Sequence, residues 1–456
     1  MADSKTIAAI STPNAVGGIS VLRISGPEAI AAADRVFRPV SGKPLASHKG
    51  YTAAYGTIFD GEETLDDVVA TVFLGPKSYT GEDVVEISCH GGLYVTRRIL
   101  MAIMKQGVSL AGPGEFTKRA FLNGKMSLTQ AEGVADLIMA SGQQGLRSAR
   151  GAMQGELYRK IRGCTDRLLT VSGHIAAYMD YPEEEIDPVE SNEIRDALAD
   201  VKAQLDGLLA NFDQGKMIRE GVETVILGKP NVGKSTLMNL LAGTKKSIVT
   251  DIPGTTRDVV EETVTLDGLV LRLADTAGIR ETEDFVEKAG VELALQRLDT
   301  AQLVLAVFDS SSPLSQEDKD LIKRLEGLPC VAVCNKSDLE QQLDMEFLRA
   351  HFPHIVEISA RENQGLSELT REVMDVLSLT GTDVSGPMLA NLRQFECAQR
   401  ASNLLGEAQA TLVGGYTLDA VDVSLESVIS ALLELTGERV TDAVVDQVFS
   451  HFCVGK

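Results

Sequence analysis

The residues whose spacing points most directly to chemistry are Gly228-Lys-Pro-Asn-Val-Gly-Lys-Ser235, the GxxxxGK[ST] pattern of a phosphate-binding loop. The loop follows the apolar run Glu223–Leu227, a predicted strand, and precedes Thr236–Ala242, a predicted helix. In that context the backbone N–H groups of the loop converge on phosphate oxygens at the N-terminus of a helix. Lys234 is expected to neutralise the β- and γ-phosphates, and the Ser235 hydroxyl to bind Mg²⁺.

Three further motifs follow predicted strands in the order expected of a guanine nucleotide site. They are Asp275, Thr276, Ala277 and Gly278; Asn335, Lys336, Ser337 and Asp338; and Ser359, Ala360 and Arg361. The first lies where it can meet Mg²⁺ and the γ-phosphate, and the third fits the loop behind the base. The Asp338 carboxylate can accept hydrogen bonds from N1–H and the exocyclic amine of guanine, whereas adenine offers neither donor. Because an unpaired buried acceptor costs about 1–3 kcal/mol, Asp338 is expected to select GTP over ATP. Together the four motifs predict a GTPase domain.

The segments between these motifs alternate short apolar runs with helical patterns, which indicates a parallel α/β sheet. The predicted strands are Glu223–Leu227, Val270–Ala274, Leu303–Phe308, Cys330–Cys334 and Ile355–Ile358. The first 118 residues also have an α/β pattern. Strands are predicted there at Ile19–Ile24, Asp66–Leu74 and Val84–Cys89, and a helix at Gly92–Lys105.

Two long tracts without proline are predicted to be helical, one between Pro113 and Pro182 and one after Pro387. After Pro188 another helix is predicted, because apolar side chains recur there at helical spacing: Leu198, Val201, Leu205, Leu208, Leu209 and Phe212. The second tract has the same pattern in Leu425, Val428, Ile429, Leu432 and Leu433. Each apolar stripe must be buried, and the economical solution packs the two tracts on each other around an inserted GTPase domain. Two independent bundles are the alternative.

The predicted fold class is therefore multidomain, with an N-terminal α/β domain, a split helical bundle and an inserted P-loop GTPase domain. The predicted boundaries are 1–118 for the N-terminal domain, 119–215 and 379–456 for the two parts of the helical domain, and 216–378 for the GTPase domain.

Composition narrows the class of protein. The chain has 456 residues, 44% of them hydrophobic and 24% charged, which excludes disorder as the dominant state. Apolar runs such as Leu303–Phe308 are far shorter than the ~18–20 residues of a membrane span, and the N-terminus lacks the pattern of a signal peptide. Six scattered cysteines suit reduced thiols, so we expect a cytoplasmic protein. The net charge of −22 argues against a nucleic-acid coat protein.

The motif set resembles the translation-factor-like GTPases, and the chain as a whole is similar to the tRNA-modification GTPase family MnmE/TrmE. The resemblance covers the N-terminal domain, the helical domain split by a GTPase domain, and the terminal Cys453-Val-Gly-Lys456. That tetrapeptide matches the family signature of Cys, an aliphatic residue, Gly and Lys at the C-terminus.

The position after Asp275–Gly278, where Ras-like enzymes place a water-orienting glutamine, holds Ile279, so catalytic help is expected from elsewhere. Asn231 and the polar loop Thr250–Asp258 offer oxygen ligands that suit a monovalent cation. The resemblance implies K⁺ bound by Asn231, Thr250, Ile252 and Thr255, Mg²⁺ bound by Ser235 and Thr256, and a water-orienting Glu287. It also implies that two GTPase domains dimerise across their nucleotides. Beyond the three motifs above, the expected GTP-binding residues are Asn231, Val232, Gly233, Lys234, Ser235, Thr236, Thr250, Asp251, Ile252, Pro253, Gly254, Thr255 and Thr256.

For the N-terminal domain the resemblance implies binding of 5-formyl- or 5,10-methylene-tetrahydrofolate through Arg23, Glu82, Lys125 and Lys456, and formation of a homodimer. It further implies an FAD-dependent partner (MnmG/GidA) in a heterotetramer-type complex. With tRNA as substrate, the two would add aminomethyl or carboxymethylaminomethyl groups at C5 of the wobble uridine, position 34. Cys453 is either catalytic, as a thiolate activated by Lys456 or another base, or merely packed near the terminus.

Two alternatives come from other functional classes. A ribosome-assembly or regulatory GTPase switch would carry a basic RNA-binding module, whereas the helical segments beside the GTPase motifs are acidic. A stand-alone folate-dependent transferase with a regulatory GTPase domain would be active without a flavoprotein.

Overall fold

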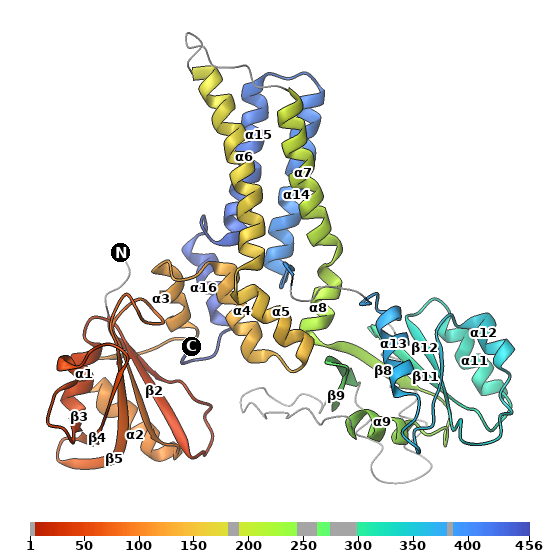
Figure 1. Ribbon diagram of the computed structural model, residues 1–456, viewed down its shortest axis with the longest axis horizontal. Coiled ribbons are helices and arrows are strands. Elements are labelled where there is room, and N and C mark those ends of the chain that lie inside the picture. The colour runs from red at the N-terminus through yellow and green to blue at the C-terminus, as the bar shows by residue number, and fades with distance from the viewer. Residues whose placement is uncertain (1–4, 181–190, 244–261, 274–297, 299, 381–385) are drawn as a thin grey trace. The chain divides into compact units, whose positions relative to one another are not determined.

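The computed structural model describes residues 5–180, 191–243, 262–273, 298, 300–380 and 386–456. The chain divides into two compact units (Figure 1). Unit 1 comprises Met1–Ala135, Ile161–Val189 and Val413–Lys456, and unit 2 comprises Asp136–Lys160 and Glu190–Leu412. No helix in the described part of the chain is long and apolar enough to cross a membrane.

Unit 1 contains a seven-stranded sheet in the order β3-β4-β5-β6-β2-β1-β7. Its strands are β1 (Ile7–Ile10), β2 (Ile19–Ser25), β3 (Phe37–Pro39), β4 (Thr52–Asp60), β5 (Glu63–Phe73), β6 (Val84–His90) and β7 (Ser109–Leu110). All neighbouring strands are antiparallel except β1 and β7. The strands predicted at β2, β5 and β6 are confirmed within three residues at each end, whereas β1, β3, β4 and β7 were not predicted.

The two faces of this sheet differ because side chains alternate along each strand. On β2, Leu22 and Ile24 enter a core with α1 (Ala29–Val36), η1 (Leu45–Ser47) and α2 (Leu93–Met104). Arg23 lies between them in sequence and therefore faces the opposite side. A smaller core that includes Ile7, Ala9 and Phe116 covers that side, with Tyr79 packed against it.

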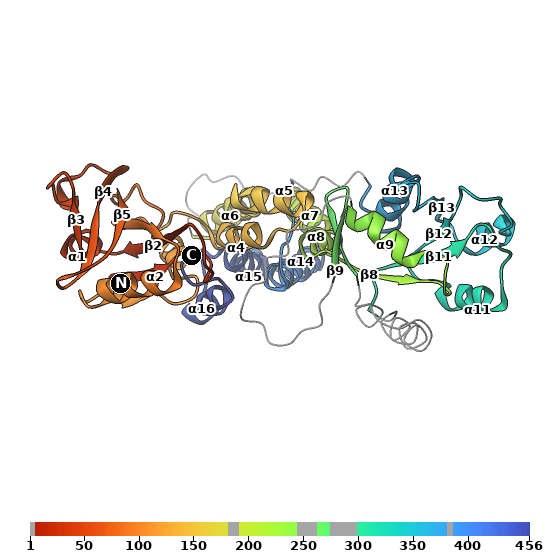
Figure 2. The same cartoon turned by 90° about the horizontal axis from the view of Figure 1, so that it is seen from below.

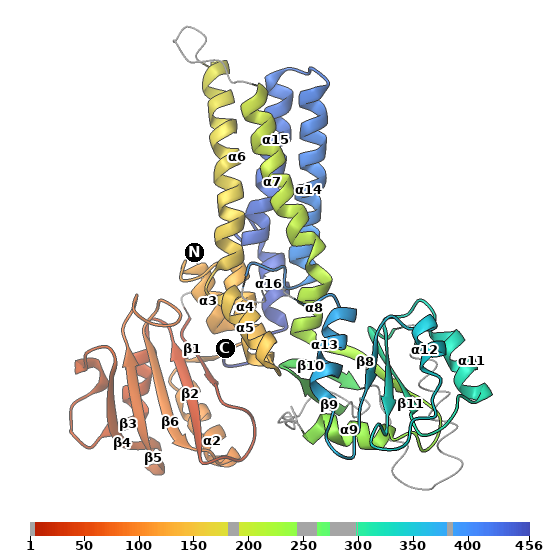
Figure 3. The same ribbon diagram turned by 45° about the vertical axis from the view of Figure 1, so that its right-hand side comes forward.

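The helices of the predicted bundle pair within each unit. They are α3 (Glu115–Leu122), α4 (Leu128–Met139), α5 (Gln143–Met153), α6 (Glu156–Asp180), α7 (Ser191–Ala210), α8 (Phe212–Glu220), α14 (Leu392–Val413), α15 (Leu418–Thr436) and α16 (Asp442–Ser450). In unit 1, Ser172 of α6 donates to Asp422 of α15 at 2.6 Å. In unit 2, α7 and α14 lie side by side (Figure 3), and Lys202 of α7 donates to Ser402 of α14 at 2.8 Å. Helices from before and after the GTPase motifs thus pack on each other, which confirms the prediction of a split bundle.

Unit 2 contains a six-stranded sheet in the order β13-β12-β11-β8-β10-β9 (Figure 2). Its strands are β8 (Val222–Leu227), β9 (Glu262–Leu266), β10 (Leu269–Leu273), β11 (Leu303–Asp309), β12 (Cys330–Asn335) and β13 (Ile355–Glu357). Every pair is parallel except β9 with β10. Helices α9 (Lys234–Gly243) and α13 (Leu366–Val376) pack on one face, and α11 (Gln316–Leu325) and α12 (Met345–His351) on the other. The predicted parallel α/β sheet is confirmed, and β9 is an additional antiparallel strand.

Candidate functional site

The phosphate-binding loop connects the buried strand β8 to the N-terminus of α9, as the sequence predicted. Asn231 and Gly233 both have positive φ, +64° and +95°. A Cβ atom at Gly233 would lie 2.2 Å from Nδ2 of Asn335, so only glycine allows this close approach. These two positions turn the chain tightly just before α9. The N–H groups of the loop therefore lie at the N-terminus of this helix, where the helix dipole favours an anion.

Lys234 is folded back onto its own loop. Its Nζ donates to the carbonyl oxygens of Gly228 and Lys229, each at 2.8 Å. Ser235 and Thr236, the next residues of α9, are exposed at the start of the helix. The motif lysine is therefore held at the loop, where its charge can meet phosphate oxygens once those carbonyls release it.

Asn335 joins two of the predicted motifs to each other. Its Nδ2 donates to the carbonyl oxygen of Val232 at 2.9 Å, and its Oδ1 accepts from the backbone N–H of Ala360 at 3.0 Å. The side chain is buried, and both of its partners belong to buried residues. This one amide holds the phosphate-binding loop and the Ser359–Arg361 loop in a common frame.

Asp338 and Lys336 lie in the loop after β12. Ser359 donates its hydroxyl hydrogen bond to Asp338 at 2.6 Å, which lowers the pKa of this exposed carboxyl. Lys336 pairs with Asp309 at the end of β11, 2.5 Å away. Burial alone would raise the pKa of Asp309, but hydrogen bonds from Lys336 and Ser311 outweigh it and the net pKa is lowered. Both carboxylates are therefore charged at neutral pH.

These segments meet because they follow neighbouring parallel strands. Asp309 pairs with Asn335 at the ends of β11 and β12, and Ala306 of β11 pairs with Leu227 of β8. Ligands of open α/β sheets bind at the carboxyl edge of the strands, which is the edge where these loops lie. The remaining expected residues, Thr250–Thr256, Asp275–Gly278 and Glu287, lie outside the described residues.

A second cluster of polar and aromatic groups lies in unit 1, on the face of the sheet opposite α1 and α2. The guanidinium of Arg23 pairs with Glu86 on the adjacent strand, with Nη2 2.7 Å and Nε 2.9 Å from the carboxylate. It stacks over Tyr79 and Phe116, 5.3 and 5.5 Å from the ring centroids. Its third nitrogen, Nη1, is buried and has no hydrogen-bond partner among the described residues. An orphaned cationic donor of this kind is suited to an anionic or carbonyl group of a ligand.

The C-terminal tetrapeptide brings Lys456 to this cluster. Gly114 donates its N–H to the Cys453 carbonyl at 3.2 Å, and the Ser11 hydroxyl donates to the Gly455 carbonyl at 3.0 Å. Val454 forms an antiparallel bridge with Pro113. The Nζ of Lys456 is 6.0 Å from the centroid of Tyr79. Burial and the nearby charge of Arg23 lower the pKa of Lys456.

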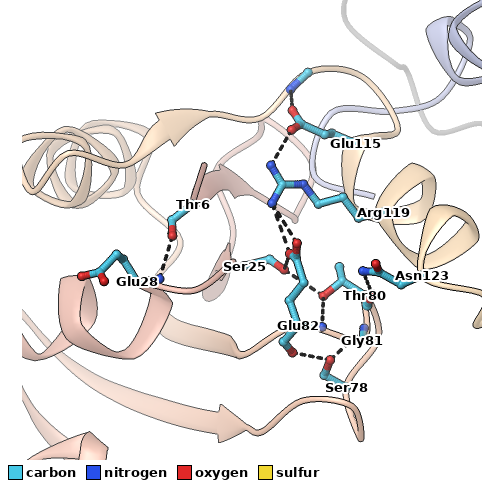
Figure 4. A network of polar contacts seen from close by, with 11 residues as sticks. Thr6, Ser25, Glu28, Ser78, Thr80, Gly81, Glu82, Glu115, Arg119 and Asn123 are labelled. Carbon is cyan, nitrogen blue, oxygen red and sulfur yellow. Dashed lines mark hydrogen bonds and ion pairs between the residues drawn. The ribbon is translucent and has the colours of Figure 1, made fainter. Parts of the chain in front are cut away.

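Glu82 belongs to a neighbouring network (Figure 4). Both of its carboxylate oxygens accept from Arg119 at 3.2 Å, and Ser25 donates to one of them at 2.7 Å. Arg119 is in turn held by Glu115 one helical turn earlier, at 2.9 Å. Thr80 contacts Ser25 at 2.8 Å. Glu82 is thus a well-anchored hydrogen-bond acceptor that remains partly exposed.

The other two residues predicted for unit 1 have looser surroundings. Lys125 is exposed, and its Nζ donates to the carbonyl oxygen of Pro76 at 2.8 Å. Its stem lies against Gly81, the residue before Glu82, since a Cβ on Gly81 would be 3.6 Å from its Cγ. Cys453 has an exposed side chain, so it is not packed in the interior.

The structure adds residues that sequence reasoning missed. Tyr79, Glu86 and Phe116 contact Arg23, and Arg119 anchors Glu82. Tyr79, Glu82 and Glu86 belong to the single run YTGEDVVE, so their clustering was a usable signal. Arg119 had no such signal, because its role depends on the packing of α3 beside Glu82.

Comparison with known proteins assigns the family. The model of the MnmE helical domain matches residues 128–453, and the model of the GTP-binding protein TrmE N-terminus matches residues 6–125. The tRNA modification GTPase MnmE of Bacillus licheniformis is 42% identical over 99% of this chain and 100% of its own length. The protein of the same name from Geobacillus kaustophilus is 42% identical over 100% of both chains. The chain therefore belongs to the MnmE family of tRNA modification GTPases.

Proposed function

We propose that this GTPase uses a folate one-carbon unit, together with an FAD-dependent partner, to add an aminomethyl or carboxymethylaminomethyl group at C5 of the wobble uridine of tRNA. The observation that carries the folate part is the Arg23 cluster. The guanidinium of Arg23, whose buried Nη1 has no hydrogen-bond partner in the described part of the chain, lies over Tyr79 and Phe116, and the terminal Lys456 is beside it. Cations next to aromatic rings suit a flat heterocycle that carries carboxylates.

In this proposal Arg23 and Lys456 bind anionic groups of the folate, and Lys125 contributes at the margin. Glu82 accepts hydrogen bonds from the N–H donors of the pterin ring, because Arg119 and Ser25 hold its carboxylate in a fixed orientation. The bound folate supplies the one-carbon unit. Cys453 is exposed, three residues after the end of α16, and is proposed as a catalytic thiol of this site.

For the nucleotide site we propose that Asn231–Thr236, Asn335–Asp338 and Ser359–Arg361 bind GTP, together with the segments Thr250–Thr256 and Asp275–Gly278. The exposed hydroxyl of Ser235 and the amide oxygen of Asn231 are hard oxygen donors, which fits Mg²⁺ and K⁺ respectively. Thr256 would complete the Mg²⁺ site, and Thr250, Ile252 and Thr255 the K⁺ site. These cations would neutralise charge on the phosphates, while Glu287 orients the attacking water.

We further propose that the chain works as a homodimer within a complex with the flavoprotein, and that GTP turnover gates the modification site. The domain limits 1–118, 119–215, 216–378 and 379–456 are part of this proposal. The acidic balance of the chain supports it, since a partner could provide most of the tRNA affinity.

The experiment combines a binding assay with nucleoside analysis. Calorimetric titration of 5-formyl-tetrahydrofolate is made into the wild type, Arg23→Gln and Arg35→Gln, the last being an exposed arginine of the same sheet domain. Loss of charge-assisted contacts worth about 1.5–3 kcal/mol predicts a 10- to 150-fold weaker affinity for Arg23→Gln and no change for Arg35→Gln.

In cells lacking the gene, mass spectrometry of tRNA nucleosides should show loss of C5-substituted wobble uridines. The Arg35→Gln protein should restore them and the Arg23→Gln protein should not. Equal folate affinity of both variants would refute the assignment of Arg23, and an unchanged nucleoside profile would refute the role in wobble modification.

A further inference from the structure

Lys229, the second residue of the phosphate-binding loop, leaves the loop sideways and reaches the N-terminus of α11. Its Nζ lies 2.6 Å from Oδ2 of Asp318 and 3.3 Å from the hydroxyl oxygen of Ser315. The Asp318 side chain is only 3% exposed and that of Lys229 is 23% exposed. The pair is therefore shielded from solvent far more than an ordinary surface ion pair.

The carboxylate of Asp318 is held rigidly before it meets the lysine. It accepts from the backbone N–H of Ser315 at 2.9 Å and from the Ser315 hydroxyl at 2.7 Å. The hydroxyl oxygen of Ser315 accepts in return from the N–H of Asp318, which completes a capping box. Helix α11 is itself anchored, because Ile322 and Leu325 are buried in the core of the second sheet.

A neutral side chain would suffice for this cap. The second carboxylate oxygen, Oδ1, is buried and has no hydrogen-bond partner among the described residues. Burying a carboxylate with one oxygen unsatisfied costs free energy that a cap alone does not offset, whereas the ammonium of Lys229 does. The charge at Asp318 therefore points to a role for the ion pair.

The backbone of Lys229 contacts Lys234, the lysine of the GxxxxGK[ST] motif. Its carbonyl oxygen accepts from Nζ of Lys234 at 2.8 Å, beside the carbonyl of Gly228. Fixing the side chain of residue 229 on α11 thus limits where this carbonyl, and the loop around it, can move. The negative charge of Asp318 also reduces the repulsion between the two neighbouring lysines.

We propose that Lys229 is a positioning residue of the GTPase site: its ion pair with Asp318 holds the phosphate-binding loop in the conformation that receives nucleotide. The function given above assigns no role to either residue. Because the ion pair already restricts the loop, the loop loses less conformational entropy when nucleotide binds. Breaking the pair should therefore weaken nucleotide affinity more than it slows the chemical step.

The test is a double-mutant cycle on the full chain with Lys229→Met, Asp318→Asn and the two combined. Asparagine at 318 can keep the capping box through its amide oxygen while losing the charge. The measured quantities are the dissociation rate of mant-GDP and the kcat and KM of GTP hydrolysis. Each single variant is expected to raise the dissociation rate and KM about tenfold and to change kcat less than threefold. The double variant should match either single one, because each substitution breaks the same pair.

Two further variants act as controls. Lys229→Arg keeps the charge and should restore dissociation and KM to within about threefold of the wild type. Lys323→Met removes the same charge from the exposed side of α11 and should change neither quantity. Thermal unfolding of the nucleotide-free proteins separates loss of fold from loss of positioning.

Wild-type dissociation and KM in Lys229→Met, or multiplied effects in the double variant, would overturn the proposal. The same holds if kcat alone falls. If Lys229→Met does not fold, Asp318→Asn compared with Lys323→Met decides by the same criteria.

Discussion

Asn335→Ala tests whether one buried amide sets the geometry of the nucleotide site. In the wild type this side chain makes two hydrogen bonds, 2.9 Å to the Val232 carbonyl and 3.0 Å from the Ala360 N–H. Alanine removes both and leaves a buried carbonyl and a buried N–H without their partner. Each unsatisfied group costs about 1–3 kcal/mol, so for the two groups the free energy of unfolding of unit 2 should fall by about 2–6 kcal/mol.

The assay begins without nucleotide, so that lost contacts to GTP cannot contribute. Differential scanning calorimetry is suited to this chain because it has no tryptophan. A loss of about 2–6 kcal/mol corresponds to a melting temperature lower by roughly 4–24 °C for a unit of this size. Hydrogen exchange at the Ala360 amide should accelerate at the same time, because that N–H has lost its acceptor.

The matched control is Asn403→Ala, which removes an exposed asparagine of α14 whose amide accepts from Gln399 at 3.2 Å. It should leave the melting temperature nearly unchanged, since alanine is the better helix former. If Asn335→Ala melts within about 1 °C of this control and the Ala360 amide stays protected, Asn335 does not hold the two loops together. The reasoning would then be wrong.

Three other predictions address separate parts of the chain. Ser359→Ala removes the hydroxyl that lowers the Asp338 pKa, so this pKa should rise in a carboxyl NMR titration. On acidification the variant therefore loses the negative charge of Asp338 at a higher pH than the wild type, and its affinity for mant-GDP should fall at that higher pH. An unchanged Asp338 titration would contradict the assigned cause. Arg23→Met removes a charge that, with burial, lowers the Lys456 pKa. Without that charge the ¹³Cε titration midpoint of Lys456 should be higher than in the wild type. The destabilisation that comes from burying charged Lys456 is lost as the pH rises through its lowered folded-state pKa, so the variant should lose it at a higher pH. An unchanged midpoint would show that the charge of Arg23 does not act on Lys456. Gly142→Ala puts a Cβ 2.6 Å from the carbonyl oxygen of Gly268, which accepts from the Gln144 N–H in the first turn of α5, so it should destabilise unit 2 by about 1–3 kcal/mol in calorimetry. Gly163→Ala, which adds a Cβ in open space, should instead stabilise its helix by about 0.5–1 kcal/mol. Equal melting temperatures of the two variants would argue against the close contact at Gly142.

Much of the second sheet could be predicted because its signals are local. The strands β8, β11 and β12 are short, mostly apolar and almost entirely buried, and β8 and β12 are each followed directly by a nucleotide-binding motif. In a parallel sheet such motifs necessarily meet at one edge, so strand order along the chain was enough to gather them. The split bundle was predictable for a similar reason, since every apolar helical stripe requires a partner.

Other features depend on residues far apart in the chain. Strand β4 went unpredicted although five of the nine residues in TAAYGTIFD are β-branched or aromatic, because Ala53, Ala54 and Gly56 interrupt the run. Its place in the sheet comes from its pairing with β3 and β5. The register of β2 against β6 places Glu86 opposite Arg23, and a slip by one residue would separate them. No local pattern in either strand carries that information.

By itself the sequence determined that the site is of the guanine-nucleotide class. The spacing of the glycines, the ends of the strands and the carboxylate that reads guanine are all properties of short segments, so they can be recognised without the tertiary structure. Only the tertiary structure decided which charges are paired. It joined Ser11 to Gly455 across 444 residues and Lys229 to Asp318 across 89, and it left Nη1 of Arg23 with no hydrogen-bond partner among the residues that the structure describes. These contacts arise where separate elements pack, and the free energy of an ion depends on the burial and neighbours that only packing provides.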